Sequence, residues 1–236
     1  MSTPPGSTRP STRPKQRARP RNARATSSSS SSRMPWLIAA LVVVIGLAAL
    51  IAVMGTGGGG DSTGVESAPV TVNGTPLAAA GGSGMINPAS DPAVGKTVPS
   101  LAGSTPTGSA ISFTPTGKPT VYLFVAHWCP HCQAELPRIA TWIDEGRFAS
   151  NGVVWRTVST AVDSSRDNYP PSAWFARVKW DEPVMVDSTK GDAATAFGLK
   201  SFPYMLFVDG NGVVKQRGTG ELTLAEFETG IKAITG

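Results

Sequence analysis

Two cysteines three residues apart constrain the fold of this chain more than any other feature. Cys129 and Cys132 are the only cysteines in the sequence. The apolar run 121–126 ends shortly before them and has the length and composition of a buried strand. Beyond Cys132, apolar residues recur at helical spacing from Leu136 to Ile143. The pair is therefore expected at the point where a strand gives way to a helix.

This position explains the chemistry expected of the pair. The first turn of a helix has unpaired backbone N–H groups and the positive end of the helix dipole, and both favour a thiolate. We therefore expect Cys129 to attack disulfides, because the thiolate is the attacking species. Cys132 lies on the same helical face and can close a disulfide with Cys129. It is expected to be more buried, to keep a higher pKa and to resolve the mixed disulfide. Pro130 suits a helix start, and a protonated His131 would stabilise the thiolate further.

Two other uses of a cysteine pair are open. A structural zinc ion normally takes four protein ligands, and the other nearby candidates are His127 and His131, both next to the same motif. A structural disulfide between residues three apart closes a very short loop and constrains the unfolded chain little. The sequence therefore favours a redox-active pair, with no metal and no cofactor, and His127 is interpreted as incidental.

The motif and its surroundings resemble the active site of the thioredoxin superfamily. The resemblance rests on residues 118–120 (KPT), the strand that follows, and residues 128–137 (WCPHCQAELP). The W-C-x-x-C-x-x-E-x-P form is similar to the membrane-anchored TlpA and ResA-type redoxins. The central Pro-His pair is similar to that of the DsbA-type oxidases. The resemblance implies that the chain is an enzyme, a protein thiol–disulfide oxidoreductase.

The resemblance and the order of the predicted elements agree on the fold class. Strands are expected at 121–126, 152–158, 182–187, 204–208 and 213–217, with helices at 129–148, 172–178, 191–197 and 223–234. Alternating strands and helices followed by a hairpin predict an α/β fold. The resemblance makes this a thioredoxin fold over residues 91–236, with a mixed central sheet flanked by helices.

The resemblance also implies roles for residues near the cysteines. Pro203 matches the cis-proline that lies against the cysteine pair in the superfamily, and the backbone of Phe202 would bind substrate peptide. Trp128 is expected to shield the cysteines. Glu135 matches a glutamate of the ResA-like active site and could exchange a proton with Cys132. Alternatively, Glu135 is a first-turn acid that merely suits the helix dipole.

The first 55 residues differ in composition from the rest. Residues 1–35 contain eight Lys or Arg and no acid, which predicts a disordered basic tail. Residues 36–55 contain no charge and, as a helix, would span roughly 30 Å, the thickness of the hydrocarbon core of a bilayer. A cleaved signal peptide is the alternative, but its apolar core is usually about 7–15 residues long. A single transmembrane helix is therefore favoured.

The distribution of charge predicts the topology. The basic tail precedes the apolar segment, while Asp61 and Glu66 follow it, so the positive-inside rule places the N-terminus in the cytoplasm. Residues 56–90 are rich in Gly, Ser, Thr, Ala and Pro and are expected to form a flexible linker. The catalytic domain would then lie outside the cell membrane, where disulfides persist. Nucleic acid is therefore not an expected partner of the tail.

Three functions are compatible with these features. The first is a membrane-tethered enzyme that oxidises or isomerises cysteines of exported proteins. The Pro-His pair and the predicted location outside the membrane favour it. A TlpA or ResA-type reductase, for example in cytochrome c maturation, is favoured by the E-x-P continuation. A non-catalytic redox sensor or metal-handling module is less favoured, because no further His or Cys residues flank the site. With one cysteine pair, the domain needs a membrane redox partner that resets it.

Overall fold

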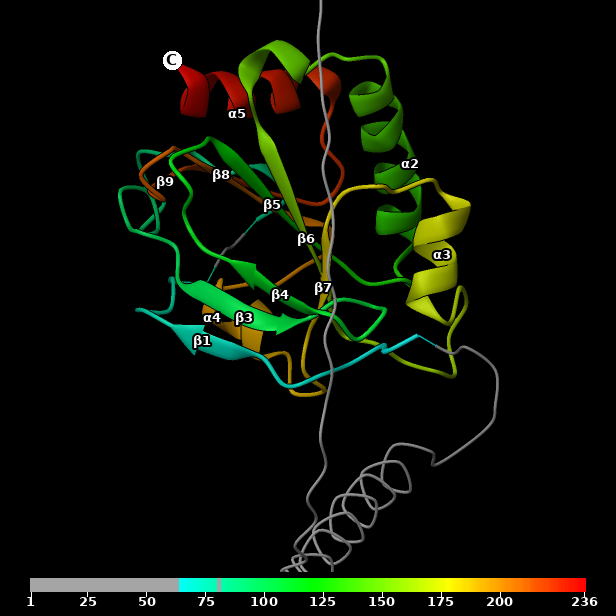
Figure 1. The fold of residues 1–236 in the computed structure, drawn as a ribbon. Helices are drawn as coiled ribbons and strands as arrows, with labels where there is room; N and C mark the ends of the chain where they lie inside the picture. Colours follow the sequence, from blue (N-terminus) through cyan, green and yellow to red (C-terminus); the bar gives the residue numbers. More distant parts are fainter. Residues whose placement is uncertain (1–63, 80–81) are drawn as a thin grey trace, which may run out of the picture. The chain divides into compact units, whose positions relative to one another are not determined.

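A nine-stranded mixed sheet is the framework of residues 64–79 and 82–236, the part of the chain that the computed structural model describes (Figure 1). The strand order is β1-β3-β7-β6-β5-β8-β9-β2, with β4 paired to β3. The strands are β1 (Thr71–Asn73), β2 (Gly84–Met85), β3 (Ser100–Ser104), β4 (Ala110–Phe113), β5 (Thr120–Val125), β6 (Val154–Ser159), β7 (Val184–Val186), β8 (Tyr204–Val208) and β9 (Val214–Thr219). The helices are α2 (Pro130–Asp144), α3 (Pro171–Arg177), α4 (Asp192–Ala196) and α5 (Leu224–Thr235), with a short 3-10 helix at Ala149–Asn151.

Strand β5 lies in the middle of the sheet because its side chains are suited to burial on both faces. All six of its residues are buried. It pairs parallel with β6 and antiparallel with β8. A strand that is covered on both faces requires such a continuous apolar run rather than alternation. The two kinds of pairing confirm the predicted mixed sheet.

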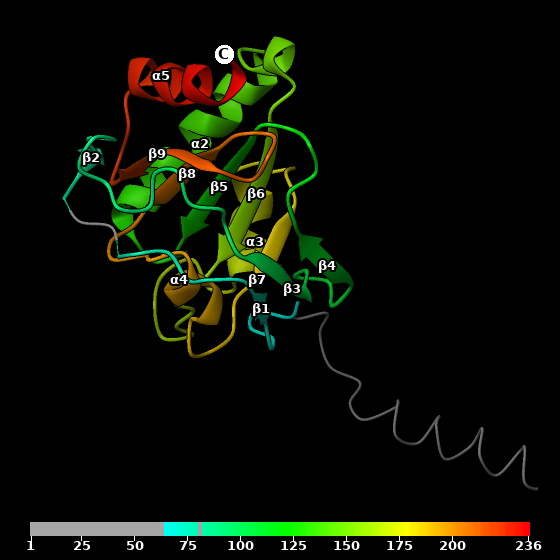
Figure 2. The ribbon, with the colours of Figure 1, turned by 90° about the vertical axis from the view of Figure 1, so that its left-hand side faces the viewer.

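Two apolar clusters cover the two faces of the sheet. On one face, α2, α3 and α5 pack against β5 through side chains such as Leu136, Trp174 and Phe227. The other face is covered by α4 and the β3–β4 hairpin (Figure 2). The second cluster includes Leu101 of β3 and Phe197, which directly follows α4. This arrangement confirms the predicted α/β class, in which helices flank the sheet.

Helix α2 begins at the cysteine pair. Cys129 is its N-cap, with extended backbone angles (φ −74°, ψ 121°), and Pro130 is the first helical residue. The helix ends at Asp144, before the predicted end at 148, because Gly146 adopts a left-handed conformation with φ 73°. The predicted order of strand, cysteine pair and helix is confirmed, and Cys129 lies at the open N-terminus of α2.

The predicted flexible linker over residues 56–90 is wrong for much of its described part. β1 pairs with β3 and β2 pairs with β9, so these strands form the two ends of the sheet. Leu77 is buried, and its N–H donates to the Ala196 carbonyl at 2.8 Å. Glu66 accepts hydrogen bonds from the N–H and the hydroxyl of Ser172 at the start of α3. The composition of this segment did not predict its order, because the segment is held by backbone hydrogen bonds to the sheet. Such bonds require no apolar periodicity in the sequence.

The remaining N-terminal predictions lie outside the described residues. They are the basic tail over 1–35, the transmembrane helix over 36–55 and the first part of the linker. Within residues 64–79 and 82–236, no helix combines the length and the apolar composition that crossing a membrane requires.

Candidate active site

The structure brings the two cysteines together at the start of α2. Cys129 retains 6% of its accessible surface and Cys132 retains none. Both are free thiols. The Cys132 side chain donates a hydrogen bond to the sulfur of Cys129. Their positions match the predicted disulfide-forming pair.

The surroundings of Cys129 lower the pKa of its thiol to about 6. The hydrogen bond from Cys132 contributes most to this decrease, and burial opposes it. The backbone N–H groups of Cys132 and His131 and the charge of His131 lower the pKa further. These N–H groups belong to the first turn of the helix, where they have no intrahelical partner. Cys129 is therefore a thiolate at neutral pH.

The pKa of Cys132 is shifted in the opposite direction. Burial raises the pKa of its thiol far above the usual range, and its hydrogen bond to Cys129 raises it further. The charges of Cys129 and Glu135 act in the same direction. The contrast between the two thiols supports the predicted roles, in which Cys129 attacks and Cys132 resolves the mixed disulfide.

Glu135 is a fully buried carboxylate close to Cys132 along α2. It accepts a hydrogen bond from the Leu222 N–H at 3.0 Å and another from Arg138. Burial raises the pKa of Glu135, although both contacts oppose this increase. The first turn of α2 contains no acidic residue, so the alternative of a first-turn acid is wrong. Proton exchange with Cys132 stays a prediction, and the raised pKa suits it.

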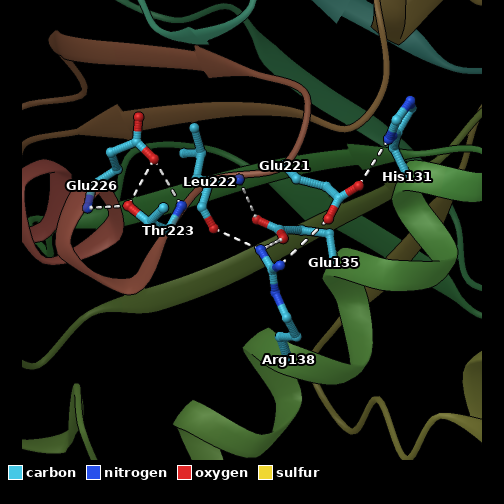
Figure 3. Close-up of polar contacts among 7 residues, drawn as sticks. All are labelled: His131, Glu135, Arg138, Glu221, Leu222, Thr223 and Glu226. Atoms are coloured by element: carbon cyan, nitrogen blue, oxygen red, sulfur yellow. Dashed lines mark hydrogen bonds and ion pairs between the residues drawn. The ribbon is translucent and has the colours of Figure 1, made fainter.

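His131 is exposed and pairs with an acid from another element. Its side chain retains 66% of its accessible surface, and Nδ1 lies 2.8 Å from Glu221 Oε1. This hydrogen bond is the main reason that the pKa of His131 is raised. The other oxygen of Glu221 lies 3.3 Å from Arg138 Nη1. His131, Glu221, Arg138 and Glu135 thus form a continuous series of polar contacts (Figure 3).

Trp128 forms one wall of the site. Its indole N–H donates to the Ala161 carbonyl at 2.7 Å. Its ring meets Phe202 nearly edge-on, with 6.0 Å between ring centroids, and the Arg166 guanidinium lies 5.0 Å from its centroid. Trp128 and Phe202 both pack against the apolar cluster that contains Cys129. This placement is consistent with the predicted shielding of the cysteines.

The Phe202–Pro203 peptide bond is cis, as the resemblance implies. Pro203 is buried, and its carbonyl accepts a hydrogen bond from the Gly220 N–H at 2.8 Å. Gly220 begins the loop that carries Glu221, so the cis-proline and the histidine of the motif contact the same loop. Binding of substrate peptide by the Phe202 backbone stays a prediction.

The interpretation of His127 as incidental is wrong. This residue is 1% exposed, and its Nδ1 lies 2.8 Å from the Asp167 carbonyl. Its Nε2 accepts a hydrogen bond from the Asp163 N–H at 3.2 Å. Because a carbonyl can only accept and an N–H can only donate, these partners place the proton of the neutral ring on Nδ1. His127 therefore fastens the loop after β6 to the end of β5.

Arg138 and Glu221 are site residues that the sequence reasoning missed. Arg138 lies three residues after Glu135, and this helical spacing is a signal that could have found it. Glu221 is 90 residues from His131 in the sequence. Only the folding of the sheet brings the loop after β9 beside α2, so no local pattern indicates this contact.

Comparison with known proteins assigns the site to a family. The redoxin family model matches residues 93–231, which is more than half of the chain. This chain belongs to the redoxin family. The redoxin is a thiol–disulfide oxidoreductase of the TlpA and ResA-like type, as the resemblance implied.

Two individual relatives illustrate the similarity. Sporulation thiol-disulfide oxidoreductase A of Bacillus subtilis (strain 168) is 25% identical to this redoxin over 121 residues, which cover 51% of this chain and 71% of that protein. A crystal structure described as thiol:disulfide interchange protein DsbE from Chlorobium tepidum has a TM-score of 0.50 at 23% identity, covering 61% of this chain and 98% of that one. The second similarity shows that the fold of the redoxin is thioredoxin-like.

Proposed function

We propose that this redoxin is an extracytoplasmic, membrane-tethered enzyme that oxidises or isomerises cysteines of exported proteins. The contrast between the two thiols carries the proposal, since the pKa of Cys129 is about 6 whereas burial keeps Cys132 protonated. A stabilised thiolate favours the reduced form of the pair. A pair whose reduced form is stabilised is an oxidant of other thiols.

In the oxidising direction, a substrate thiolate attacks the Cys129 sulfur of the Cys129–Cys132 disulfide. The bond between the two cysteines breaks, and Cys132 leaves with the electron pair and takes up a proton. A second substrate thiolate then attacks the substrate sulfur of the mixed disulfide, and Cys129 leaves as a thiolate. The substrate loses two electrons and two protons, the pair gains the electrons, and one proton goes to solvent. In isomerisation, reduced Cys129 attacks a substrate disulfide and is released without net electron transfer.

The N-terminal sequence supports the proposed location. The basic residues of 1–35 precede the apolar segment 36–55, which is the arrangement of an anchor with a cytoplasmic N-terminus. The catalytic domain would then meet exported proteins outside the membrane. Each oxidation leaves the only cysteine pair reduced, so the enzyme needs a membrane redox partner that removes the electrons. Nucleic acid has no part in this proposal.

A disulfide reductase of the TlpA or ResA type, for example in cytochrome c maturation, is the second candidate. In this direction Cys129 attacks a substrate disulfide, and Cys132 must then lose its proton to attack the mixed disulfide. Buried Glu135, whose pKa is raised, favours this candidate because it is suited to receive such a proton.

A non-catalytic redox sensor or metal-handling module is the third candidate. Across the residues that the structure describes, no three His, Cys, Asp or Glu side chains are grouped as metal ligands would be. No specific contact therefore favours this candidate over thiol–disulfide exchange.

The reduction potential of the full-length protein, titrated against glutathione, tests the direction. We expect a value between about −120 and −200 mV, the range of strong oxidases and disulfide isomerases. A value at or below about −270 mV, where thioredoxin lies, would contradict the oxidase and favour the reductase. The double variant Cys129→Ser, Cys132→Ser has no cysteine pair and is the negative control.

A further inference from the structure

The loop between β9 and α5 is held against the active-site helix by its backbone. Leu222 in this loop is fully buried. Its N–H donates to Glu135 Oε1 at 3.0 Å, and its carbonyl accepts from Arg138 Nη2 at 2.7 Å. On one side of it, the Gly220 N–H donates to the carbonyl of the cis-proline at 2.8 Å. These contacts fix the backbone around Glu221 without using the Glu221 side chain.

The other end of the loop is fixed by the start of α5. The Thr223 hydroxyl accepts from the Glu226 N–H, and the Glu226 carboxylate accepts from the Thr223 N–H at 2.7 Å (Figure 3). This reciprocal pair is a capping box, which fixes the first turn of the helix. Glu221 therefore projects from a backbone that is ordered on both sides, and a side chain supported in this way is held in a defined position.

The Glu221 carboxylate lies between two cationic side chains of α2. Oε1 lies 2.8 Å from His131 Nδ1, and Oε2 lies 3.3 Å from Arg138 Nη1. His131 must carry its proton on Nδ1 to donate to this carboxylate. Figure 3 shows Glu221 between the ring of His131 and the guanidinium of Arg138. A single carboxylate thus connects the residue between the two cysteines with the Arg138–Glu135 pair.

We propose that Glu221 is a positioning residue for disulfide exchange, which holds the protonated ring of His131 beside the Cys129 thiolate. The proposal deepens the proposed function and rests on it. The charged groups that face His131 are Cys129 from the same helix and Glu221 from the loop, with Arg138 behind Glu221. Because both facing groups are anionic when ionised, the ring keeps its proton to higher pH than an isolated histidine would. Cys129 thereby keeps a cationic neighbour to higher pH than it would beside an isolated histidine.

The Glu221→Gln variant tests the first half of the proposal, because it removes the charge and keeps the shape. In the full-length oxidised protein, NMR titration of the His131 ring should show a proton affinity about two- to five-fold lower than in the wild type, the range for exposed ion pairs. The matched control is Glu228→Gln, an exposed carboxylate on α5, which should leave the titration unchanged. An unchanged His131 titration in Glu221→Gln would overturn the proposal.

A double-mutant cycle tests whether Glu221 acts through His131. At pH 7, the equilibrium constant of the pair with glutathione should shift about two-fold toward the disulfide in Glu221→Gln, because the positive charge beside the thiolate is reduced. In a His131→Ala background the same substitution should cause no shift. An equal shift in both backgrounds would overturn the proposal, because Glu221 would then act without the histidine.

The two measurements separate the failure of this proposal from that of the proposed function. The His131 titration uses the oxidised protein and needs no turnover. A wild-type pair that does not exchange with glutathione would reject the proposed function, whatever the titration shows. Unfolding by urea checks that Glu221→Gln keeps the stability of the wild type, as the independent anchoring of Leu222 and Thr223 predicts.

Discussion

Cys129 and Cys132 occupy the same helical turn, yet their thiols ionise very differently. Cys129 faces the free N–H groups of the first turn and accepts a hydrogen bond from Cys132, while Cys132 is enclosed by apolar side chains. At the scale of single residues, a shift of three positions along α2 is therefore enough to separate an attacking thiolate from a protonated resolving thiol.

The pH dependence of the reduction potential should reveal the Cys129 thiolate. Below a pKa of about 6, reduction takes up two protons with two electrons, and the potential should fall by about 59 mV per pH unit. Above that pKa only one proton is taken up, so the slope should decrease to about 30 mV per pH unit. Equilibration with glutathione between pH 4.5 and pH 8 measures both slopes. A single slope across this range would contradict the thiolate assignment.

Substitution of each cysteine should separate their roles. Cys132→Ser keeps a hydroxyl that can donate to Cys129, so we expect the thiolate to persist and mixed disulfides with substrate to accumulate. Cys129→Ser should form none and should lose turnover, because the protonated thiol of Cys132 is fully buried. Mass spectrometry of the trapped adducts distinguishes the two variants. Equal trapping by both would show that either cysteine can attack.

At the scale of elements, the loop between β6 and α3 is ordered by the residues just before the cysteines. Ala161 and Asn168 adopt left-handed backbone conformations, with φ of 51° and 62°. Such conformations persist in non-glycine residues where the surroundings hold them. Trp128 binds the Ala161 carbonyl, and the Asn168 side chain donates to the His127 carbonyl at 3.4 Å. The loop thus forms a wall of the site because His127 and Trp128, which follow β5, bind it.

His127→Phe should loosen this loop. The substitution keeps a ring but leaves the Asp163 N–H and the Asp167 carbonyl without their partner, so we expect the free energy of unfolding to fall by about 2–4 kcal/mol. Urea unfolding measures the loss, and proteolysis should cut within 160–169 more readily than in the wild type. His131→Phe is the matched control, because His131 is exposed. Equal losses in the two variants would refute the anchoring role.

At the scale of the whole molecule, a buried ion pair joins the N-terminal part of the domain to β9. Arg217 and Asp91 are almost fully buried, and Arg217 Nε lies 2.8 Å from Asp91 Oδ2. Arg217 also donates to the Ala78 carbonyl and to the Tyr204 hydroxyl, each at 2.8 Å. These contacts attach the segment before β3 to the sheet. For this reason, among others, the domain begins before residue 91, its predicted start.

Asp91→Asn should destabilise the whole domain. Removing one partner leaves the Arg217 charge buried without compensation, which costs about 3–5 kcal/mol. Burial raises the pKa of Asp91, but hydrogen bonds from Arg217 and the Ala93 N–H outweigh it, so the net pKa is lowered. The stabilisation is therefore present above the unfolded pKa of about 3.9 and is lost as pH falls through the lower folded value.

Urea unfolding of wild type and Asp91→Asn between pH 2 and pH 6 checks this prediction. The difference in stability between the two proteins should be greatest near pH 6 and should shrink toward pH 2. Glu228→Gln serves as an exposed control whose stability should follow that of the wild type. A difference that stays constant with pH would show that the Asp91 carboxylate is not the titrating group.

The sequence by itself determined the features that depend on neighbouring residues. The continuous apolar run of β5, the helix start at Pro130 and the capping box that begins at Thr223 all act within a few residues. The resemblance carried by the motif added the cis bond at Pro203. From these, the α/β class, the mixed sheet and the position of the cysteine pair could be predicted.

The tertiary structure alone decided the contacts between remote segments. Glu221 meets His131 across 90 residues, and Arg217 meets Asp91 across 126. The role of His127 and the pairing of β1 and β2 belong to the same class, because their partners come from other parts of the chain. Propensity and periodicity report only local preferences, whereas these contacts arise from strand pairing and burial, which depend on the whole fold.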